Sequence, residues 1–453
     1  AAAPCRSPRT VPGITVLLRD FEEEMDNDLA GTARSFSSSS FPVLVAADAP
    51  PYPPVPFPAG VNLLILRPSP ELPPPRPELH IRTRHVALVP DGTRWLPGLL
   101  ERMRDELEEG GGGGNGSTRL VVAPVGSARP RCLELQAELR RWTLRYRNTG
   151  TCQALEGAAV LLLRTRDLFS LPFPLARPLP TSLFIQSAVR GWQLRLLPAS
   201  FPLARLPPLS PHGRWKADKL AAAHRARLMD ELGIKLEVLA DGTERWYGCS
   251  KETARCFGSV QAGTPRYLLS GRWTPPCCLL ALRATARHVA AQLEAAGVRY
   301  WLEGGSLLGA ARLGDIIPWD YDVDFGIYRD DVRKCRWLAA AAAGQEAVED
   351  AEGFLWEKAA EGDFYRVHYS RSNRLHVDLW PFYPRGSLLT KDTWLGHPQD
   401  VEFPESLVQL RVPVPFAGFR AMAPKHTRAF LELKFGPGAI ERPEYPNPAV
   451  RRL

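Results

Sequence analysis

The chain has 453 residues, a formal net charge of +8, and 45% hydrophobic and 23% charged residues. This composition is typical of a globular protein, and the length favours two domains over one. The positive charge suggests an anionic partner such as a nucleotide or phosphate, and a mildly basic, solvated surface is the alternative. Because no dense lysine–arginine block stands next to aromatic residues, a nucleic-acid-binding protein is disfavoured. No apolar run is long enough to span a membrane, and no signal peptide is visible.

The first half alternates β-rich runs with helical segments, which predicts a mostly parallel sheet with helices on its faces. An amphipathic helix is expected at Leu99–Glu109. This layout is similar to a nucleotide-sugar glycosyltransferase half-domain, in which a pair of carboxylates binds a metal after one strand. Here Asp91 is followed by Gly92, so the second acid is missing and we expect a non-catalytic domain. The strands are predicted at Ile14–Arg19, Val43–Ala47, Leu63–Leu66, Val86–Pro90 and Leu120–Val125.

The half of the chain that carries the acidic motif is expected to begin close to Cys249. We therefore expect an N-terminal α/β stem domain, residues 1–245, and a catalytic α+β domain, residues 246–453. Gly233 and Gly297 each stand where a helix is expected to end. The predicted helices are Lys216–Leu232, Leu279–Ala296 and Ser306–Arg312, and the predicted strands of the second domain are Val298–Glu303, Tyr321–Gly326 and Leu375–Trp380.

Three aspartates, Asp320, Asp322 and Asp324, alternate near the end of the segment Trp301–Gly326. In a strand, residues two apart point to the same side, so the three carboxylates would share one face. They would repel one another unless a cation lay between them, and carboxylate oxygens suit Mg²⁺ or Mn²⁺. An acidic strand by itself can also be a solvated edge. The glycine-rich turn before it favours the metal-site interpretation.

Gly304 and Gly305 would let the backbone approach a phosphate closely, and the N-terminus of the following helix would cradle it with help from Ser306. Asp378 lies within an apolar predicted strand, where an unpaired carboxylate is costly, so it is the candidate for a further acid of the site.

Several roles remain open at this stage. Asp320 is a third metal ligand, a base, or an acid that positions Arg312. Arg312, Lys358, Arg366 and Lys434 are candidates to hold phosphates, with surface solvation as the alternative for each. Trp319 and Tyr321 either stack on a base or pack in the core.

The turn, the Asp322-Val323-Asp324 motif and the later Asp378 resemble the nucleotidyltransferase superfamily. Within it, the segment Gly304–Gly326, which reads GGSLLGAARLGDIIPWDYDVDFG, is similar to the signature of the LicD-type phosphotransferases. The chain as a whole resembles the fukutin-related branch of that family, and the resemblance is most specific after Trp246. The supporting segments are Arg299–Arg312, His376–Arg385, Lys391–Leu395, Gln399–Glu405 and Leu431–Gly438.

The resemblance implies a metal-dependent phosphotransferase that moves ribitol 5-phosphate from CDP-ribitol to the phosphorylated O-mannosyl glycan of α-dystroglycan. Asp320, Asp322, Asp324 and Asp378 would be catalytic, and Gly304, Gly305, Ser306 and Arg312 would bind the donor. It also implies a homo-oligomeric, type II membrane protein in the Golgi lumen, anchored through a segment upstream of this chain. The residues alone leave two alternatives open: another CDP-alcohol phosphotransferase or nucleotidyltransferase, and a non-catalytic glycan-binding scaffold.

Four of the eight cysteines cluster with the spacing C-x6-C-x20-C-C. Four thiolates suit a structural, tetrahedral Zn²⁺ in a loop at residues 249–278, whereas two disulfides would suit an oxidising compartment. The cluster consists of Cys249, Cys256, Cys277 and Cys278.

The loop that this cluster closes carries Lys251 and Arg255, which we expect to face an anionic group such as the acceptor phosphate. Cys132 and Cys152 are expected to form a disulfide, and Cys335 to be a buried thiol. The triplet Asn115-Gly116-Ser117 is a glycosylation sequon, as in secretory proteins.

Overall fold

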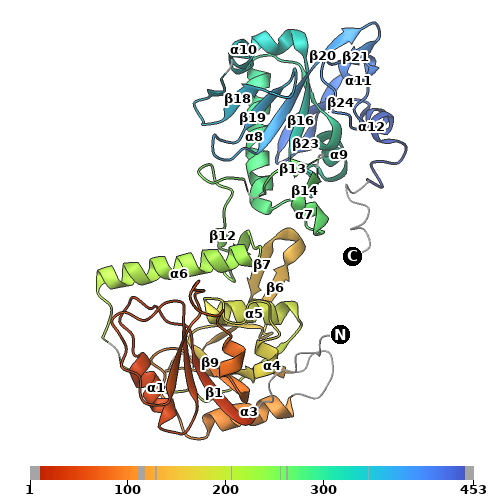
Figure 1. Ribbon diagram of the computed structural model, residues 1–453. Helices are drawn as coiled ribbons and strands as arrows, with labels where there is room; N and C mark the ends of the chain where they lie inside the picture. Colours follow the sequence, from red (N-terminus) through yellow and green to blue (C-terminus); the bar gives the residue numbers. More distant parts are fainter. Residues whose placement is uncertain are drawn as a thin grey trace, which may run out of the picture. The chain divides into compact units, whose positions relative to one another are not determined.

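The computed structural model describes residues 11–110, 118–127, 130–205, 207–255, 257–261, 264–344 and 346–443. Asn115 and Cys256 lie outside these residues. The chain forms two compact units (Figure 1). The first consists of Ala1–Ala137 and Leu144–Arg245, and the second of Glu138–Thr143 and Trp246–Leu453. Within the described residues, no helix is both long enough and apolar enough to cross a membrane.

The first unit is built on a seven-stranded sheet with the order β10-β5-β9-β4-β1-β2-β3. Only β9 runs antiparallel to its neighbours, so the prediction of a mostly parallel sheet is confirmed. Every residue of β2 is buried, as expected for a central strand covered on both faces. The strands are β1 (Val11–Leu18), β2 (Val43–Ala47), β3 (Val61–Ile65), β4 (Thr83–Leu88), β5 (Thr118–Pro124), β9 (Ala159–Arg164) and β10 (Gln193–Leu196).

Helices accompany this sheet, and α3 (Leu99–Glu109), which packs on β5 and β9, has the predicted bounds. The long helix α6 (Pro211–Glu231) ends one residue before the predicted end at Leu232 but begins before the predicted start at Lys216. The other helices of the unit are α1 (Leu29–Ser37), α2 (Pro77–His80), α4 (Thr165–Leu168) and α5 (Leu179–Val189).

A second, five-stranded sheet with the order β12-β11-β7-β6-β8 was not expected from the sequence, because several of its strands are short and polar. The predicted disulfide between Cys132 and Cys152 is present in it. Its strands are β6 (Arg131–Glu138), β7 (Thr143–Arg147), β8 (Ala154–Glu156), β11 (Leu236–Val238) and β12 (Glu244–Trp246), with a 3-10 turn at Leu139–Arg141.

Asp91, the lone acid after β4, has a structural role in the first unit. Its carboxylate accepts hydrogen bonds from the backbone N–H of Asp28, at 2.7 Å, and from the hydroxyl of Thr32, at 3.1 Å. Asp28 is the residue directly before α1, and Thr32 lies in the first turn of this helix. The acid therefore holds the N-terminal turn of a helix.

The second unit contains a mixed sheet with the order β15-β16-β20-β19-β18-β17, extended by β21 and β22. The central pair β16 and β20 is parallel, and β15 and β19 flank it in antiparallel directions. The strands are β15 (Tyr300–Leu302), β16 (Val323–Tyr328), β17 (Val348–Glu349), β18 (Leu355–Lys358), β19 (Tyr365–His368), β20 (His376–Arg385), β21 (Leu388–Thr390) and β22 (Phe403–Pro404).

Helices α8 (Pro276–Ala295), α9 (Gly304–Leu313) and α10 (Arg336–Ala343) pack against this sheet (Figure 1). Gly297 follows α8 with a φ of +67°, as expected for a glycine that ends a helix. The remaining elements are β13 (Val260–Gln261), β14 (Thr264–Pro265), α7 (Arg266–Leu269), a 3-10 turn at Arg329–Lys334, α11 (Ser406–Gln409), β23 (Arg411–Phe416), β24 (Phe419–Pro424) and α12 (Thr427–Phe435).

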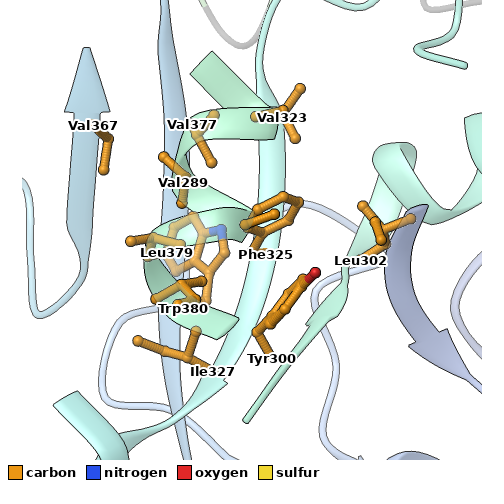
Figure 2. Close-up of a cluster of buried hydrophobic side chains, with 14 of the residues drawn as sticks. Val289, Tyr300, Leu302, Val323, Phe325, Ile327, Val367, Val377, Leu379 and Trp380 are labelled. Atoms are coloured by element: carbon orange, nitrogen blue, oxygen red, sulfur yellow. The ribbon is translucent and has the colours of Figure 1, made fainter. Parts of the chain in front are cut away.

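On one face of the two central strands, the core of the second unit contains their odd-numbered residues. Val323, Phe325, Val377 and Leu379 are fully buried and lie around Val289 of α8 (Figure 2). Because side chains alternate along a strand, the even-numbered residues of β16 and β20 project to the opposite face. The apolar face therefore fixes the direction of the aspartates on the other face.

Gly326 allows a close contact across β16. A Cβ atom at this position would lie 2.3 Å from the Cε2 atom of Trp301, whose side chain is fully buried. We therefore predict that Gly326→Ala lowers the free energy of unfolding by about 1–3 kcal/mol, because the indole must shift in a packed core. Urea denaturation monitored by circular dichroism measures this effect.

Gly258 provides the control for this substitution, because a Cβ there meets nothing within 4 Å and its φ is not in the left-handed region. Gly258→Ala should change the free energy of unfolding by less than about 0.5 kcal/mol. Equal stability of the two variants would contradict the packing argument.

Candidate active site

Two of the four predicted acids face each other across the central strand pair. In the parallel register of β16 and β20, Asp324 lies directly beside Asp378. Asp378 is buried, and neighbouring strands of a sheet lie about 4.8 Å apart. The structure thus brings together carboxylates that are more than fifty positions apart in the sequence.

Asp320 and Asp322 differ from the prediction, because β16 begins at Val323 and neither residue lies in the strand. They occupy the turn that leads into it, and they lie close enough for each to influence the pKa of the other. The turn is held by Thr274, whose hydroxyl donates to the backbone carbonyl of Asp320 at 2.6 Å. Hydrogen bonds from the loop, together with strand alternation, therefore bring these acids to the site.

The Gly-Gly-Ser segment begins helix α9 directly, so the predicted turn is the first turn of the helix. Gly304 has a φ of +50°, which favours glycine, and a Cβ on Gly305 would lie 2.7 Å from a carboxylate oxygen of Asp320. In this structure the second glycine therefore makes room for an aspartate. The expected approach of a phosphate to these glycines stays a prediction.

Ser306 and Glu303 fasten this helix start to the acidic strand. The Ser306 hydroxyl accepts a hydrogen bond from the backbone N–H of Asp324 at 2.9 Å, and the Glu303 N–H donates to the Asp324 carbonyl at 3.0 Å. Both backbone groups of Asp324 are thus held by the residues that flank the two glycines. The Ser306 hydroxyl proton remains available to donate.

Burial and mutual repulsion strongly perturb the acids. Burial raises the pKa of Asp320 to about 6. Burial, with the nearby charge of Asp378, raises the pKa of Asp324 to about 7. The pKa of Asp322 is raised well above its ordinary value by burial and by the charges of Asp324 and Asp320. Such a cluster is stabilised by a cation, so these residues fit a divalent metal site.

Trp380 and Lys391 contribute to the site but were not singled out in the sequence. The indole N–H of Trp380 donates to Asp324 at 2.9 Å, and its ring stacks on Phe364 with a centroid distance of 4.2 Å. The buried ammonium of Lys391 lies 3.7 Å from the Trp380 ring centroid and pairs with Asp400 at 2.7 Å. The spacing could have indicated the role of Trp380, because it follows Asp378 by two positions in the same strand and therefore lies on the same face.

Arg366, one of the four predicted phosphate ligands, lies at the site on β19. Its Nε donates to one oxygen of Asp378 at 2.8 Å and its Nη2 to the other at 3.3 Å. The other three candidates also have partners. Lys358 pairs with Asp363 at 2.7 Å, Lys434 pairs with buried Glu303, and the exposed Arg312 donates to the carbonyl of Ile440.

A histidine absent from the sequence prediction also faces the acids. His376 begins β20, and its Nε2 lies 3.9 Å from a carboxylate oxygen of Asp378. Ligand atoms of Asp322, His376 and Asp378 all lie within 4.8 Å of one another. Burial lowers the pKa of His376 to about 4. The site therefore combines carboxylate oxygens with one imidazole nitrogen.

Three of the four clustered cysteines converge in the second unit. Sulfur atoms of Cys249, Cys277 and Cys278 lie within 4.8 Å of one another, and Cys249 and Cys277 are joined as a disulfide. The sulfur of Cys278 lies 3.7 Å from that of Cys249, and Cys278 is also part of a disulfide. Cys256 lies outside the described residues. The predicted buried thiol of Cys335 is confirmed.

The loop that begins at Cys249 is docked on the sheet. Lys251 donates to the carbonyl of Glu352 at 2.6 Å and lies 3.9 Å from the Phe354 ring centroid. Arg255 lies over Phe257 and is close enough to Arg366 for their positive charges to interact. Of the two predicted basic residues, Lys251 serves to dock the loop, whereas Arg255 belongs to the surroundings of the acidic site.

Trp319 and Tyr321, which flank Asp320, pack in an aromatic cluster around Tyr267 together with Phe257 and Trp142. Trp142 belongs to the short segment Glu138–Thr143 of this unit, and its indole donates to the Trp273 carbonyl at 2.8 Å. The core-packing interpretation of the two aromatic residues is thus confirmed.

Comparisons with known proteins account for both units. Residues 1–240 match the family model described as the fukutin-related protein stem domain. Residues 297–426 match the model described as the LicD/FKTN/FKRP nucleotidyltransferase domain. A mouse and a human protein, both called Ribitol 5-phosphate transferase FKRP, are each 57% identical over 465 residues, which span 100% of this chain and 92% of each relative. The chain belongs to the fukutin-related protein family.

Membership of the fukutin-related protein family assigns the first unit as a stem domain and the second as a nucleotidyltransferase-like domain of the LicD type. A solved structure, the lincomycin-bound antibiotic adenylyltransferase LnuA, is 13% identical with a TM-score of 0.20, over 34% of this chain and 96% of that one. A likeness at this level carries no structural argument.

The raised pKa values of the acids in this family member predict a pH-dependent stabilisation by cations. Asp320 and Asp324 have folded pKa values of about 6 and 7, above the ordinary 3.8. Their contribution to stability is therefore complete below about pH 4 and is lost as the pH rises through about 6 to 7. Without cation, the melting temperature should fall between about pH 5 and pH 8.

Saturating Mg²⁺ or Mn²⁺ should raise the melting temperature more at the higher pH, since fewer protons must leave the acids. Differential scanning fluorimetry with EDTA or metal measures both effects. Asp324→Asn should reduce the pH dependence and the metal effect together. If the metal raised the melting temperature equally at about pH 5 and about pH 8, the link between metal binding and proton release from the acids would be contradicted.

Proposed function

We propose that this chain is a ribitol 5-phosphate transferase that uses CDP-ribitol as donor. The proposed acceptor is a phosphorylated O-mannosyl glycan of α-dystroglycan. The observation that carries the proposal is the intact group of four carboxylates in a chain that is 57% identical, over its full length, to relatives named for this activity. The acids support a phosphotransferase, and the relatives' names support the ribitol phosphate.

A divalent cation, Mg²⁺ or Mn²⁺, would be held by Asp322, Asp324 and Asp378, with Asp320 beside them. When bound, it would neutralise the charge that develops on the transferred phosphate and the bridging oxygens. The fit of the residues rests on the raised pKa values of Asp322 and Asp324, since deprotonation of such acids is favoured by a cation.

In the proposed reaction, an acceptor hydroxyl attacks the phosphorus that carries ribitol and gives its proton to a carboxylate of the site. The bond between this phosphorus and the CMP oxygen breaks, and CMP leaves with the electron pair. The chain's own residues would orient the two substrates. Arg366 and Arg255 would offer guanidinium groups to phosphate oxygens beside the acids, and Gly304, Gly305 and Ser306 would offer the start of α9. Arg312 is proposed as a further donor contact.

The cysteine cluster is proposed to hold a structural Zn²⁺ through Cys249, Cys256, Cys277 and Cys278. The convergence of three sulfur atoms supports this, because four thiolates close a zinc site with no open position for substrate. The rival is a pair of disulfides, and the bond between Cys249 and Cys277 favours it. Either arrangement would fix the loop that carries Arg255.

The proposed compartment is the Golgi lumen, with an anchor upstream of this chain and assembly as a homo-oligomer. The disulfide between Cys132 and Cys152 supports an oxidising compartment. The boundary between the domains is proposed at residues 245 and 246. No observation favours the second candidate function, transfer of another CDP-linked alcohol, or the third, a scaffold without activity.

Replacement of Asp322, Asp324 or Asp378 by Asn should reduce CMP release from CDP-ribitol by about a hundredfold or more, because each change removes a charged metal ligand. The assay contains Mg²⁺ and the phosphorylated glycan acceptor, and CDP-glycerol and CDP-choline replace the donor in parallel reactions. Asp330→Asn, at an exposed acid after β16, is the control and should leave the rate unchanged.

Full activity of a folded Asp324→Asn protein would contradict the metal assignment. Faster turnover of CDP-choline than of CDP-ribitol would instead support the other CDP-alcohol transferase. Absence of CMP release from every donor by the unaltered protein would support the scaffold.

Metal analysis of protein purified without added zinc decides the cysteine proposal. We expect about one zinc per chain, and Cys277→Ser should lose it together with activity. Cys335→Ser is the control, since this buried thiol lies outside the cluster. A zinc-free, active protein in which mass spectrometry finds all four cysteines in disulfides would refute the zinc site.

A further inference from the structure

His376 occupies the same face of β20 as Asp378 and Trp380, because these three residues alternate along the strand. Its side chain is 12% exposed, and its Nε2 approaches Asp378 to 3.9 Å. In the described part of the chain, Nε2 has no hydrogen-bond partner. Nε2 of His376 thus faces the acids from a partly buried position, with no hydrogen-bond partner among the described residues.

The other ring nitrogen fixes the tautomer of His376. Nδ1 lies 3.0 Å from the backbone carbonyl of Arg374. Because a carbonyl oxygen only accepts, Nδ1 must carry the proton, and the neutral ring then has its lone pair on Nε2. Metal-binding histidines are oriented in this way, with one N–H on a carbonyl and the other nitrogen directed at the metal.

His368, the residue paired with His376 across β19 and β20, shows the contrasting arrangement. The two rings lie 5.6 Å apart, but Nε2 of His368 is 2.7 Å from a carboxylate oxygen of Glu357. Its ring is therefore engaged at both ends, since Nδ1 lies 3.3 Å from the same Arg374 carbonyl. Only His376 offers a nitrogen lone pair toward the acids.

Arg366 occupies one side of the Asp378 carboxylate with two hydrogen bonds. Each carboxylate oxygen has a second lone pair, so Asp378 can accept these bonds and still contribute to a metal site. Asp322, Asp324 and Asp320 supply the negative charge around the position, and Arg366 supplies the positive charge. The ligand atoms of Asp322, His376 and Asp378 lie within 4.8 Å of one another, so small movements would bring them around one ion.

We propose that His376 is a nitrogen ligand of the divalent cation bound by Asp322 and Asp378. The inference rests on the proposed function in one respect, that the acids bind a cation. It adds that the donor set is mixed, with oxygen and nitrogen. Mixed sets favour Mn²⁺ and later transition metals over Mg²⁺, whereas Mg²⁺ prefers oxygen alone.

Pulsed electron paramagnetic resonance of Mn²⁺ bound to the full chain tests this directly, because a coordinated imidazole gives a ¹⁴N modulation. We expect the modulation in the unaltered protein and its replacement by a ¹⁵N pattern after labelling with ¹⁵N-histidine. His376→Gln should abolish it and lower the preference for Mn²⁺ over Mg²⁺ about tenfold, as measured by calorimetry. His397→Gln, at an exposed histidine, is the control and should change neither.

The outcomes separate this inference from the proposed function. Tight Mn²⁺ binding without histidine coupling in the unaltered protein would overturn the role of His376 and leave the acidic site standing. If the unaltered protein bound Mn²⁺ no better than the Asp324→Asn variant does, both the role of His376 and the acidic metal site would be overturned. The labelling experiment needs no substitution, so it decides the question even where His376→Gln fails to fold.

Discussion

The parallel pairing of β16 with β20 is the constraint on which the rest of the second unit depends. Its register sets Asp324 beside Asp378, and a shift by one residue in one of the strands would separate these two carboxylates onto opposite faces of the sheet. The register is fixed from the opposite face, where Val323, Phe325, Val377 and Leu379 are fully buried. One face of each strand therefore provides the packing that holds the repelling charges of the other face in place.

The residues around the acids reduce, but do not remove, the unfavourable free energy of placing several carboxylates close together. Trp380 donates to Asp324, Arg366 holds both oxygens of Asp378, and backbone contacts with Ser306 and Glu303 hold the Asp324 main chain. Burial raises the pKa of Asp320 to about 6 and that of Asp324 to about 7, so these acids hold their protons more firmly than exposed aspartates do. Because a bound cation must displace those protons, proton release is linked to metal binding.

The helices and strands in which apolar residues recur regularly could be predicted from the sequence, and so could the acids of the site. The contacts between these elements could not. Helix Leu99–Glu109 and the buried strands of both units follow from apolar patterns that their tertiary contacts reinforce. The five-stranded sheet was missed because short, polar strands carry no such pattern. His376 and Trp380 were missed because their roles come from strand register, and a lone histidine or tryptophan in an apolar run is usually a core residue.

Two acids at strand ends illustrate what decides between a structural and a chemical role. Asp91 and Asp324 are both associated with strands of a buried sheet, and burial raises the pKa of each. Asp91 accepts hydrogen bonds from the Asp28 N–H and the Thr32 hydroxyl, which oppose the effect of burial on its pKa. Asp324 receives one indole N–H and faces other carboxylates. The stem acid has hydrogen-bond donors of its own domain around it, whereas the acids of the second unit face one another, and a bound proton or cation relieves their repulsion.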